Sequence, residues 1–198
     1  MSKAHSILIV EDELITASSI QELLMEEDFA VMGIAKDAAT ALRLCAKAEV
    51  PPSIVICDIN IKGNVKGTDL AGHLKKLYGC EIIFLTAYTD NHSLKAAFGQ
   101  DPVMYIVKPY TDTQLLVALD MAFHQLFRSN EKAASKNGPL VLTDREKEIA
   151  QLVARGHSSK QVARQLSISI ETVKTHRRRM LQKNNITSFS HLVYLMNG

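Results

Sequence analysis

Acidic side chains follow two apolar segments in the first half of the chain. Glu11 and Asp12 come directly after residues 6–10, and Asp58 ends the apolar run at 54–57. The carboxyl ends of parallel strands open on the same crevice of a sheet, so these side chains would lie together. Three crowded carboxylates repel one another unless a hard cation such as Mg²⁺ binds, and Mg²⁺ accepts carboxylates together with water and phosphate oxygens. The spacing therefore predicts a magnesium site.

Two further polar residues follow apolar segments in the same way. Thr86 comes after the run at 82–85, and Lys108 comes after the run at 103–107. A hydroxyl donor, an ammonium, a metal and a carboxylate nucleophile are the groups that phosphoryl transfer to aspartate requires. Each residue alone has an ordinary structural explanation, such as capping a turn, but their order along the chain favours a shared chemical site.

The elements that must position these residues alternate regularly along residues 1–125. Apolar runs predict five strands, at 6–10, 30–35, 53–58, 81–85 and 103–107. Apolar residues at helical spacing predict helices around 20–24, 38–45, 70–77 and 91–98, and a fifth that Thr111 and Gln114 open in capping-box spacing. Strands alternating with helices of this length build a parallel sheet covered on both faces. We therefore expect an α/β fold with a five-stranded, doubly wound parallel sheet.

The second part of the chain differs in composition and in pattern. The net charge of +2 is divided unevenly along the chain. Residues 1–125 contain 10 basic and 16 acidic residues, a net charge of −6, whereas residues 126–198 contain 13 basic and 5 acidic residues, a net charge of +8. Residues 128–139 are polar and small and end in Gly-Pro, which indicates a linker. Beyond it, helical spacing and the capping pairs Thr143 with Glu146 and Ser158 with Gln161 predict four helices and no strand. The expected organisation is a first domain at 1–127, a linker at 128–139 and a small all-α domain at 140–198.

The third of these four helices, at 170–183 behind the N-cap Ser169, is strongly basic. Lys174 and Arg178 are four residues apart and share a face, with Arg177 beside them. A short helix, a turn at 167–169 and a basic helix have the spacing of a helix-turn-helix. Such a helix fits the major groove of double-stranded DNA, where lysine and arginine contact guanine edges and phosphates. A solvated basic face is the alternative.

Residues 4–125 resemble the CheY-like receiver domain of two-component response regulators. The motifs are Ile-Leu-Ile-Val-Glu-Asp-Glu at 7–13, Ile-Val-Ile-Cys-Asp-Ile at 54–59, Phe-Leu-Thr-Ala-Tyr at 84–88 and Tyr-Ile-Val-Lys-Pro-Tyr at 105–110. The resemblance implies that Asp58 is the phosphoacceptor. It assigns Mg²⁺ to four oxygen ligands: Glu11, Asp12, Asp58 and the Asn60 backbone carbonyl. It also implies phosphoryl-binding and switch residues: Thr86, Tyr105 (the aromatic switch) and Lys108.

One segment departs from the usual pattern of that family. After Asp58 the chain reads Ile-Asn-Ile-Lys-Gly-Asn-Val-Lys-Gly, so Lys62 stands where a proline is usual and Gly67 comes one place late. This loop borders the phosphorylation site, so neither the phosphoryl lifetime nor the choice of phosphodonor follows from the resemblance. The Lys108–Pro109 bond, by contrast, looks like the family's cis bond.

Residues 140–196 resemble the LuxR/NarL/FixJ-type four-helix DNA-binding domain. The matching motifs are Leu142-Thr143-x-Arg145-Glu146, Ala154-x-Gly156, Val162-Ala163-x-x-Leu166 and Thr172-Val173-Lys174-Thr175-His176. The match implies that Lys174, Thr175 and Arg178 face DNA bases. It also implies that Arg177 and Arg179 contact the DNA backbone. The fourth helix corresponds to that family's dimerisation element, so a homodimer on DNA is expected.

Length and composition exclude several classes of protein. The 198 residues, 46% hydrophobic and 22% charged, are typical of a folded globular protein rather than a disordered chain. No apolar run approaches the roughly 18 residues of a membrane span, and no signal segment opens the chain. The three cysteines form no CxxC pair and sit among apolar residues, which indicates buried thiols in a reducing compartment. We expect a cytoplasmic protein with no membrane partner.

Together these features predict a two-component response regulator in which a histidine kinase or phosphotransfer protein phosphorylates the receiver and so controls DNA binding and transcription. The chief alternative is a phosphorelay intermediate or phosphate sink whose basic domain binds protein rather than DNA. An enzyme with an acidic Mg²⁺ site ranks third. The segment 63–67 lacks the ending of a nucleotide P-loop, and Asp58-Ile59-Asn60 lacks the second aspartate of Asp-x-Asp phosphatases. We expect no catalytic residues beyond the receiver site.

Overall fold

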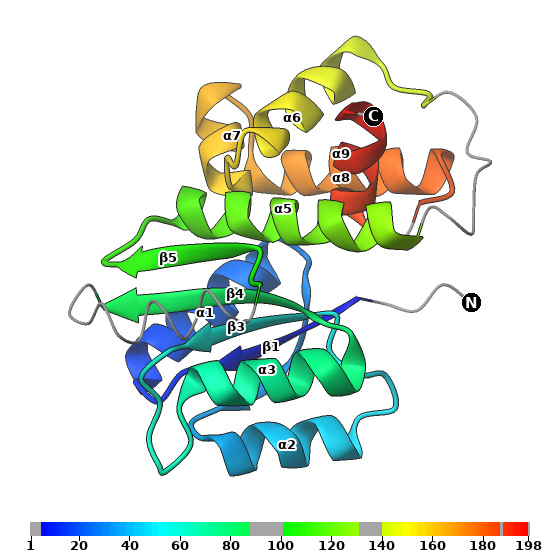
Figure 1. Ribbon diagram of the computed structural model, residues 1–198. Helices are drawn as coiled ribbons and strands as arrows, with labels where there is room; N and C mark the ends of the chain where they lie inside the picture. The colour runs from blue at the N-terminus through cyan, green and yellow to red at the C-terminus, as the bar shows by residue number, and fades with distance from the viewer. Residues whose placement is uncertain (1–4, 88–100, 131–139, 187, 198) are drawn as a thin grey trace. The chain divides into compact units, whose positions relative to one another are not determined.

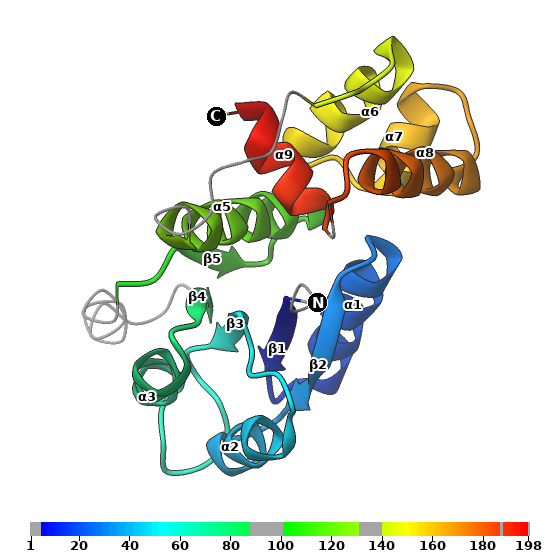
Figure 2. The ribbon, with the colours of Figure 1, turned by 90° about the vertical axis from the view of Figure 1, so that its right-hand side faces the viewer.

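The computed structural model describes residues 5–87, 101–130, 140–186 and 188–197. Their contacts divide the chain into two compact units, with the boundary after Thr111. Figures 1 and 2 together label the elements of both units. The helix predicted at 91–98 lies outside the described residues.

The first unit contains a five-stranded parallel sheet in the order β2-β1-β3-β4-β5. Its strands are β1 (Ser6–Val10), β2 (Ala30–Ala35), β3 (Ile54–Asp58), β4 (Glu81–Ala87) and β5 (Met104–Lys108). This order is that of flavodoxin-like folds, in which the direction of the crossovers reverses between β1 and β3. The predicted α/β class and parallel sheet are confirmed.

The strand bounds differ little from those predicted. β1 and β2 have the predicted limits, whereas β3 and β5 each begin one residue later. β4 continues to Ala87, because Thr86 and Ala87 pair with Val107 and Lys108 of β5. The pairing thus carries Thr86 and Lys108 to the same edge of the sheet.

Helices cover both faces of this sheet. α1 (Leu14–Glu26) lies on one face, and α2 (Ala38–Lys47) and α3 (Gly67–Tyr78) lie on the other (Figure 2). Side chains alternate along a strand, so each central strand buries apolar groups on both faces. The buried strand residues packed in the core with α2 and α3 are Leu8, Val10, Ala35, Val55, Cys57, Ile82 and Phe84. All three cysteines are buried free thiols, as predicted.

The connection from β3 to α3 depends on a close backbone approach at Gly67. Its N–H donates to the Ile59 carbonyl at 3.0 Å, and the Cys57 thiol donates to the Gly67 carbonyl at 3.5 Å. A Cβ atom on Gly67 would lie 1.9 Å from the Asp58 carbonyl oxygen. Only glycine therefore fits, and the glycine that comes one place late in the sequence is the one that holds this loop against the end of β3.

The second unit contains helices and no strand among its described residues. Its helices are α5 (Asp112–Asn130), α6 (Asp144–Ala154), α7 (Ser159–Gln165), α8 (Ile170–Lys183) and α9 (Phe189–Asn197). Both predicted capping boxes, at Thr143 and Ser158, are present, and Ser169 caps α8. Buried apolar residues of the last four helices form one core, among them Ile149, Val162, Val173, Met180 and Leu192. In the described part of the chain, no helix has the length and apolar character of a membrane span.

The contacts of α5 group it with the C-terminal helices. The Phe127 ring stacks on the His191 ring of α9 with centroids 4.7 Å apart, and the His124 and Tyr194 rings meet edge-on at 4.8 Å. α5 continues to Asn130, so residues 128–130 of the expected linker are helical, since no glycine or proline interrupts the chain before Gly138. The domain limits at 127 and 140 stay predictions.

Replacing Gly67 by alanine should destabilise the protein and displace the end of β3. Because the new methyl group would overlap the Asp58 carbonyl oxygen, we expect the free energy of unfolding to fall by about 2 kcal/mol or more. Urea denaturation followed by circular dichroism measures this loss, and the amide chemical shifts of residues 58–60 report the displacement.

Gly79→Ala is the matched control for this substitution. Gly79 has φ +65°, but a Cβ there would meet no atom within 4 Å. This variant should lose only about 1 kcal/mol, the cost of left-handed backbone in a residue with a side chain, and should leave the three amide shifts unchanged. Equal losses and unchanged shifts in both variants would contradict the packing role assigned to Gly67.

Candidate functional site

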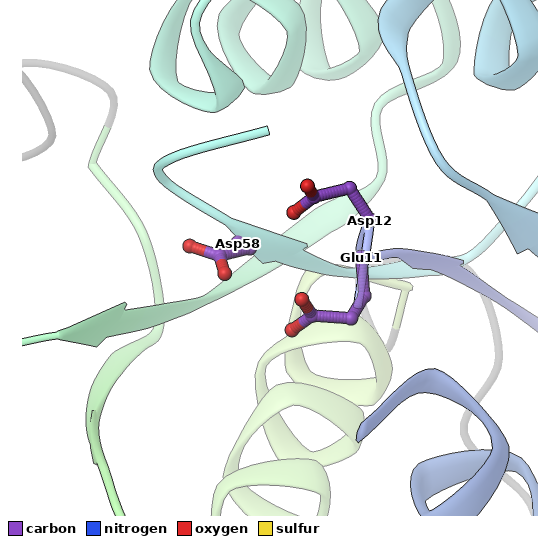
Figure 3. Close-up of side chains that lie close together, drawn as sticks. All are labelled: Glu11, Asp12 and Asp58. Atoms are coloured by element: carbon purple, nitrogen blue, oxygen red, sulfur yellow. The ribbon is translucent and has the colours of Figure 1, made fainter. Parts of the chain in front are cut away.

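The three carboxylates predicted to share a site do lie together. Glu11 and Asp12 follow β1, Asp58 ends β3, and these two strands are neighbours in the sheet. Figure 3 shows the three side chains close together, and one oxygen of each lies within 4.8 Å of the others. Glu11 and Asp58 are 1% and 6% exposed, whereas Asp12 is half-buried. Because buried like charges repel strongly, this arrangement requires cations nearby.

The ammonium of Lys108, at the end of β5, supplies one such cation. Its Nζ donates hydrogen bonds to Asp58 Oδ2 at 2.5 Å and to Glu11 Oε2 at 2.6 Å. Charge-assisted hydrogen bonds of this kind are roughly twice as strong as neutral ones. Lys108 thereby links the end of β5 to the ends of β1 and β3. The peptide bond that follows it, Lys108–Pro109, is cis as predicted.

Burial and charge shift the protonation equilibria of this cluster in opposite directions. Burial raises the pKa of Glu11; the hydrogen bond from Lys108 lowers it, and the negative charge of Asp58 raises it, with a net increase. For Lys108, burial lowers the pKa, but the hydrogen bonds to Asp58 and Glu11 outweigh burial and the pKa is raised. The lysine is therefore held in its charged form.

Backbone N–H groups fix the orientation of two of the carboxylates. Asn60 N–H donates to Asp58 Oδ1 at 2.9 Å, on the oxygen that Lys108 does not contact. Glu13 N–H donates to Glu11 Oε1 at 3.2 Å. In both cases the donor lies two residues after the acceptor, so short-range chain geometry is sufficient to form the bond. The role of metal ligand predicted for the Asn60 carbonyl stays a prediction.

Thr86 and Tyr105 lie on the two strands beyond β3. Thr86 is buried and follows Leu85, the sheet partner of Asp58, and its hydroxyl donates to the Ala87 carbonyl at 3.2 Å. Tyr105 is half-buried, with its ring stacked on Phe84 at a centroid distance of 5.7 Å. Burial, with a smaller effect of Asp101, raises the pKa of Tyr105 to about 12. The tyrosine is thus neutral at physiological pH, and the switch roles of both residues stay predictions.

A second lysine, not predicted from the sequence as a site residue, contacts the acidic cluster. Lys62, in the loop between β3 and α3, has its Nζ 3.3 Å from Asp12 Oδ2. The sequence did contain a feature that could have identified Lys62. Four residues after the predicted phosphoacceptor, this lysine stands where receiver domains usually have a proline. A charge in a loop that borders three carboxylates is a candidate for an ion pair with one of them.

α7 and α8 form the predicted helix-turn-helix. The turn between them contains Ser167 with a left-handed φ of 52°. On α8, Arg178 and Arg179 are exposed and Lys174 and Thr175 are half-buried. Among the residues that the structure describes, Lys174, Arg178 and Arg179 form no ion pair. Their positive charge is therefore available to a polyanion.

Arg177 does not belong to this basic surface, which corrects its predicted contact with the DNA backbone. It is 3% exposed, its Nη1 donates to Ser159 Oγ at 2.8 Å, and its guanidinium lies 4.7 Å from the centre of the Phe189 ring. The physical reason is helical spacing: Arg177 comes four residues after Val173 and three before Met180, both of which are fully buried. That spacing in the sequence already places Arg177 on the inner face of the helix.

Comparison with known proteins agrees with the division into an acidic α/β part and a basic helical part. Residues 7–120 match the response regulator receiver domain. Residues 140–196 match the bacterial regulatory proteins of the luxR family. The first match alone spans more than half of the chain.

Curated relatives align with nearly the whole chain. The transcriptional regulatory protein TdiR of Thauera aromatica is 30% identical over 203 residues, which cover 98% of this chain and 87% of TdiR. The transcriptional regulatory protein DesR of Bacillus subtilis is 31% identical over 183 residues, covering 90% of this chain and 89% of DesR. The nitrate/nitrite response regulator protein NarP of Escherichia coli is 28% identical over 195 residues, covering 92% and 89%.

Solved structures are similar to the whole chain or to its first part. The response regulator StyR is similar over 98% of this chain and 99% of its own, with a TM-score of 0.51 and 26% identity. The signal receiver domain of a modulated diguanylate cyclase from Desulfovibrio desulfuricans G20 is similar over 64% of this chain and 99% of its own, with a TM-score of 0.59 and 26% identity. With a receiver domain at 7–120 and a luxR-family regulatory domain at 140–196, the chain belongs to the transcriptional response regulators.

Proposed function

We propose that this response regulator accepts a phosphoryl group on Asp58 from a histidine kinase or phosphotransfer protein, and that this modification controls the binding of α8 to DNA. The observation that carries the proposal is the Lys108 ammonium, which bridges the Asp58 and Glu11 carboxylates. A carboxylate held beside a fixed cation and further oxygen ligands has the features of a nucleophile in phosphoryl transfer.

The chemistry of the donor atoms in this site fits Mg²⁺. Four oxygen ligands would hold the ion: those of Glu11, Asp12 and Asp58 and the Asn60 carbonyl. Oxygen ligands of this kind, carboxylates above all, are those that this hard cation prefers. When bound, Mg²⁺ supplies positive charge that neutralises the oxygens of the transferring phosphoryl group.

The residues of the chain itself carry out the transfer. One carboxylate oxygen of Asp58 forms the bond to phosphorus as the bond between phosphorus and the nitrogen or oxygen of the donor breaks. Lys108 then binds a phosphoryl oxygen, since phosphorylation adds close to two negative charges beside it. Thr86 turns its hydroxyl from the Ala87 carbonyl toward the phosphoryl group, and Tyr105 moves inward, which shifts a pre-existing equilibrium.

The residues of α8 that contact DNA are those whose charged group or hydroxyl can reach it. We assign Lys174, Thr175 and Arg178 to base edges and Arg179 to phosphate. A homodimer formed through α9 would present two such helices to half-sites about one helical turn apart. A protein that meets both a kinase and chromosomal DNA acts in the cytoplasm.

The alternatives have less support. A phosphorelay intermediate with a protein-binding domain requires no helix whose basic side chains are available to a polyanion. The luxR-family match at 140–196 favours a DNA-binding regulator. An enzyme with an acidic metal site disagrees with membership of a regulatory family. We therefore propose that the chemistry of this protein is its own phosphorylation and dephosphorylation.

Phosphorylation should occur at one residue and require a divalent cation. After treatment with acetyl phosphate and Mg²⁺, mass spectrometry should find one acyl phosphate on Asp58. Asp58→Asn should abolish labelling, because an amide is not a nucleophile toward phosphorus, and EDTA should suppress it. Undiminished labelling of Asp58→Asn, or labelling insensitive to EDTA, would contradict the assignment.

Two arginines of α8 should affect DNA binding differently. Arg178→Ala should weaken binding to a site identified by genomic footprinting by about 1–3 kcal/mol, with little effect on a scrambled duplex. Arg179→Ala should weaken binding to both duplexes alike and flatten the salt dependence by roughly one unit. Fluorescence anisotropy titrations of the full chain at several salt concentrations, with and without acetyl phosphate, measure both effects. The absence of salt-dependent binding to any duplex would favour the protein-binding alternative.

Arg177→Ala should act on stability rather than on DNA recognition. The substitution removes a hydrogen bond to Ser159 and the contact with the Phe189 ring. We expect the free energy of unfolding of the C-terminal unit to fall by about 1–3 kcal/mol. Thermal denaturation followed by circular dichroism tests this, and titration below the transition should show unchanged affinity for the scrambled duplex. An unchanged melting temperature with weaker binding to all DNA would restore Arg177 to the phosphate contacts.

A further inference from the structure

The loop between β3 and α3 brings a second cation to the carboxylate cluster. Lys62 Nζ lies 3.3 Å from Asp12 Oδ2, and the two side chains are 73% and 21% exposed. Lys108 contacts the other two carboxylates, Glu11 and Asp58. Each of the three carboxylates therefore has a lysine partner. With all of these groups charged, the cluster carries a net charge of −1 rather than the −2 that Lys108 alone would leave.

The position of Lys62 is fixed by the fold rather than by the ion pair. Its backbone forms a parallel bridge with Asp37, and the Asp37 side chain caps α2 by accepting from Thr40 N–H at 2.7 Å. The preceding residue, Ile61, is buried in the core with α2 and α3. The Cα of Lys62 is therefore anchored, while its flexible four-carbon side chain extends through solvent to Asp12.

We propose that Lys62 is a built-in competitor of the divalent cation, which occupies Asp12 when the metal is absent and so raises the metal concentration at which the receiver site fills. The inference rests on the proposed function of the carboxylate cluster as a metal site. Asp12 is the carboxylate that the half-buried Lys108 does not contact, so its oxygens accept a cation most readily. An ammonium on Asp12 Oδ2 must leave that oxygen before a metal binds there.

The expected size of the effect follows from the exposure of the pair. Lys62 is largely in water and can swing away from the half-buried Asp12, so the metal must overcome only an ion pair that is exposed on its lysine side. Pairs of this kind correspond to about a two- to fivefold change in an equilibrium constant. Lys62 therefore adjusts the affinity for the metal without preventing its binding.

Direct titration with Mn²⁺, monitored by the electron paramagnetic resonance signal of the free ion, tests this on the full chain without phosphodonor. Lys62→Gln should tighten Mn²⁺ binding about two- to fivefold, and Lys62→Glu should tighten it further. Lys66→Gln is the matched control. It removes the same charge from the same loop, but Lys66 is exposed and forms no ion pair among the described residues, so the dissociation constant should change less than about 1.5-fold.

A double-mutant cycle with Asp12→Asn separates the ion pair from general electrostatics. In the Asp12→Asn background, Lys62→Gln should no longer affect Mn²⁺ binding more than Lys66→Gln does. Equal effects of Lys62→Gln and Lys66→Gln in the wild-type background, or weaker binding in Lys62→Gln, would overturn the inference while leaving the metal site intact. Mn²⁺ binding that does not depend on Asp12 would overturn both the inference and the proposed metal site.

Discussion

Glu11 and Asp58 place two carboxylates at the buried ends of adjoining strands, and the ammonium of Lys108 lies between them. Loss of this shared partner would leave two buried charges uncompensated, at a cost of about 3–5 kcal/mol. β5 lies two strands away from β3, and neighbouring strands are about 4.8 Å apart. The side chain of Lys108 covers this separation together with the carboxylate side chains that extend toward it, and it places one compact charge between two acceptors.

Backbone contacts, and not side chains alone, fix the position of Asp58 in this ion pair. Asp58 is oriented by the N–H of Asn60, and the chain just beyond it packs against Gly67, where a single methyl group would overlap the Asp58 carbonyl. The loop in between is anchored by Ile61 in the core and by the bridge of Lys62 to Asp37. The loop with the unusual sequence is therefore an ordered part of the site.

The C-terminal unit uses arginine in two different ways. Arg177 is sequestered by Ser159 and Phe189, and this contact holds α8 against α7 and α9. Arg178 and Arg179, the next two residues, are exposed. Successive positions on a helix are about 100° apart, so neighbours of identical type can have unrelated functions. A count of the basic residues on α8 therefore overestimates the number of positive charges that are exposed to DNA.

The helices and strands follow from the sequence alone, because periodicity, capping pairs and strand-end carboxylates are local properties of the chain. The bounds of β1, β2 and α8 follow from them, as does the convergence of Glu11, Asp12 and Asp58 on one sheet edge. Which side chains meet across neighbouring strands depends on the tertiary structure. The adjacency of β1 and β3, the reach of Lys108 across β4 and the pairing of Lys62 with Asp12 depend on contacts between segments distant in sequence. Such contacts are set by the packing of the whole sheet and its helices, which no local pattern encodes.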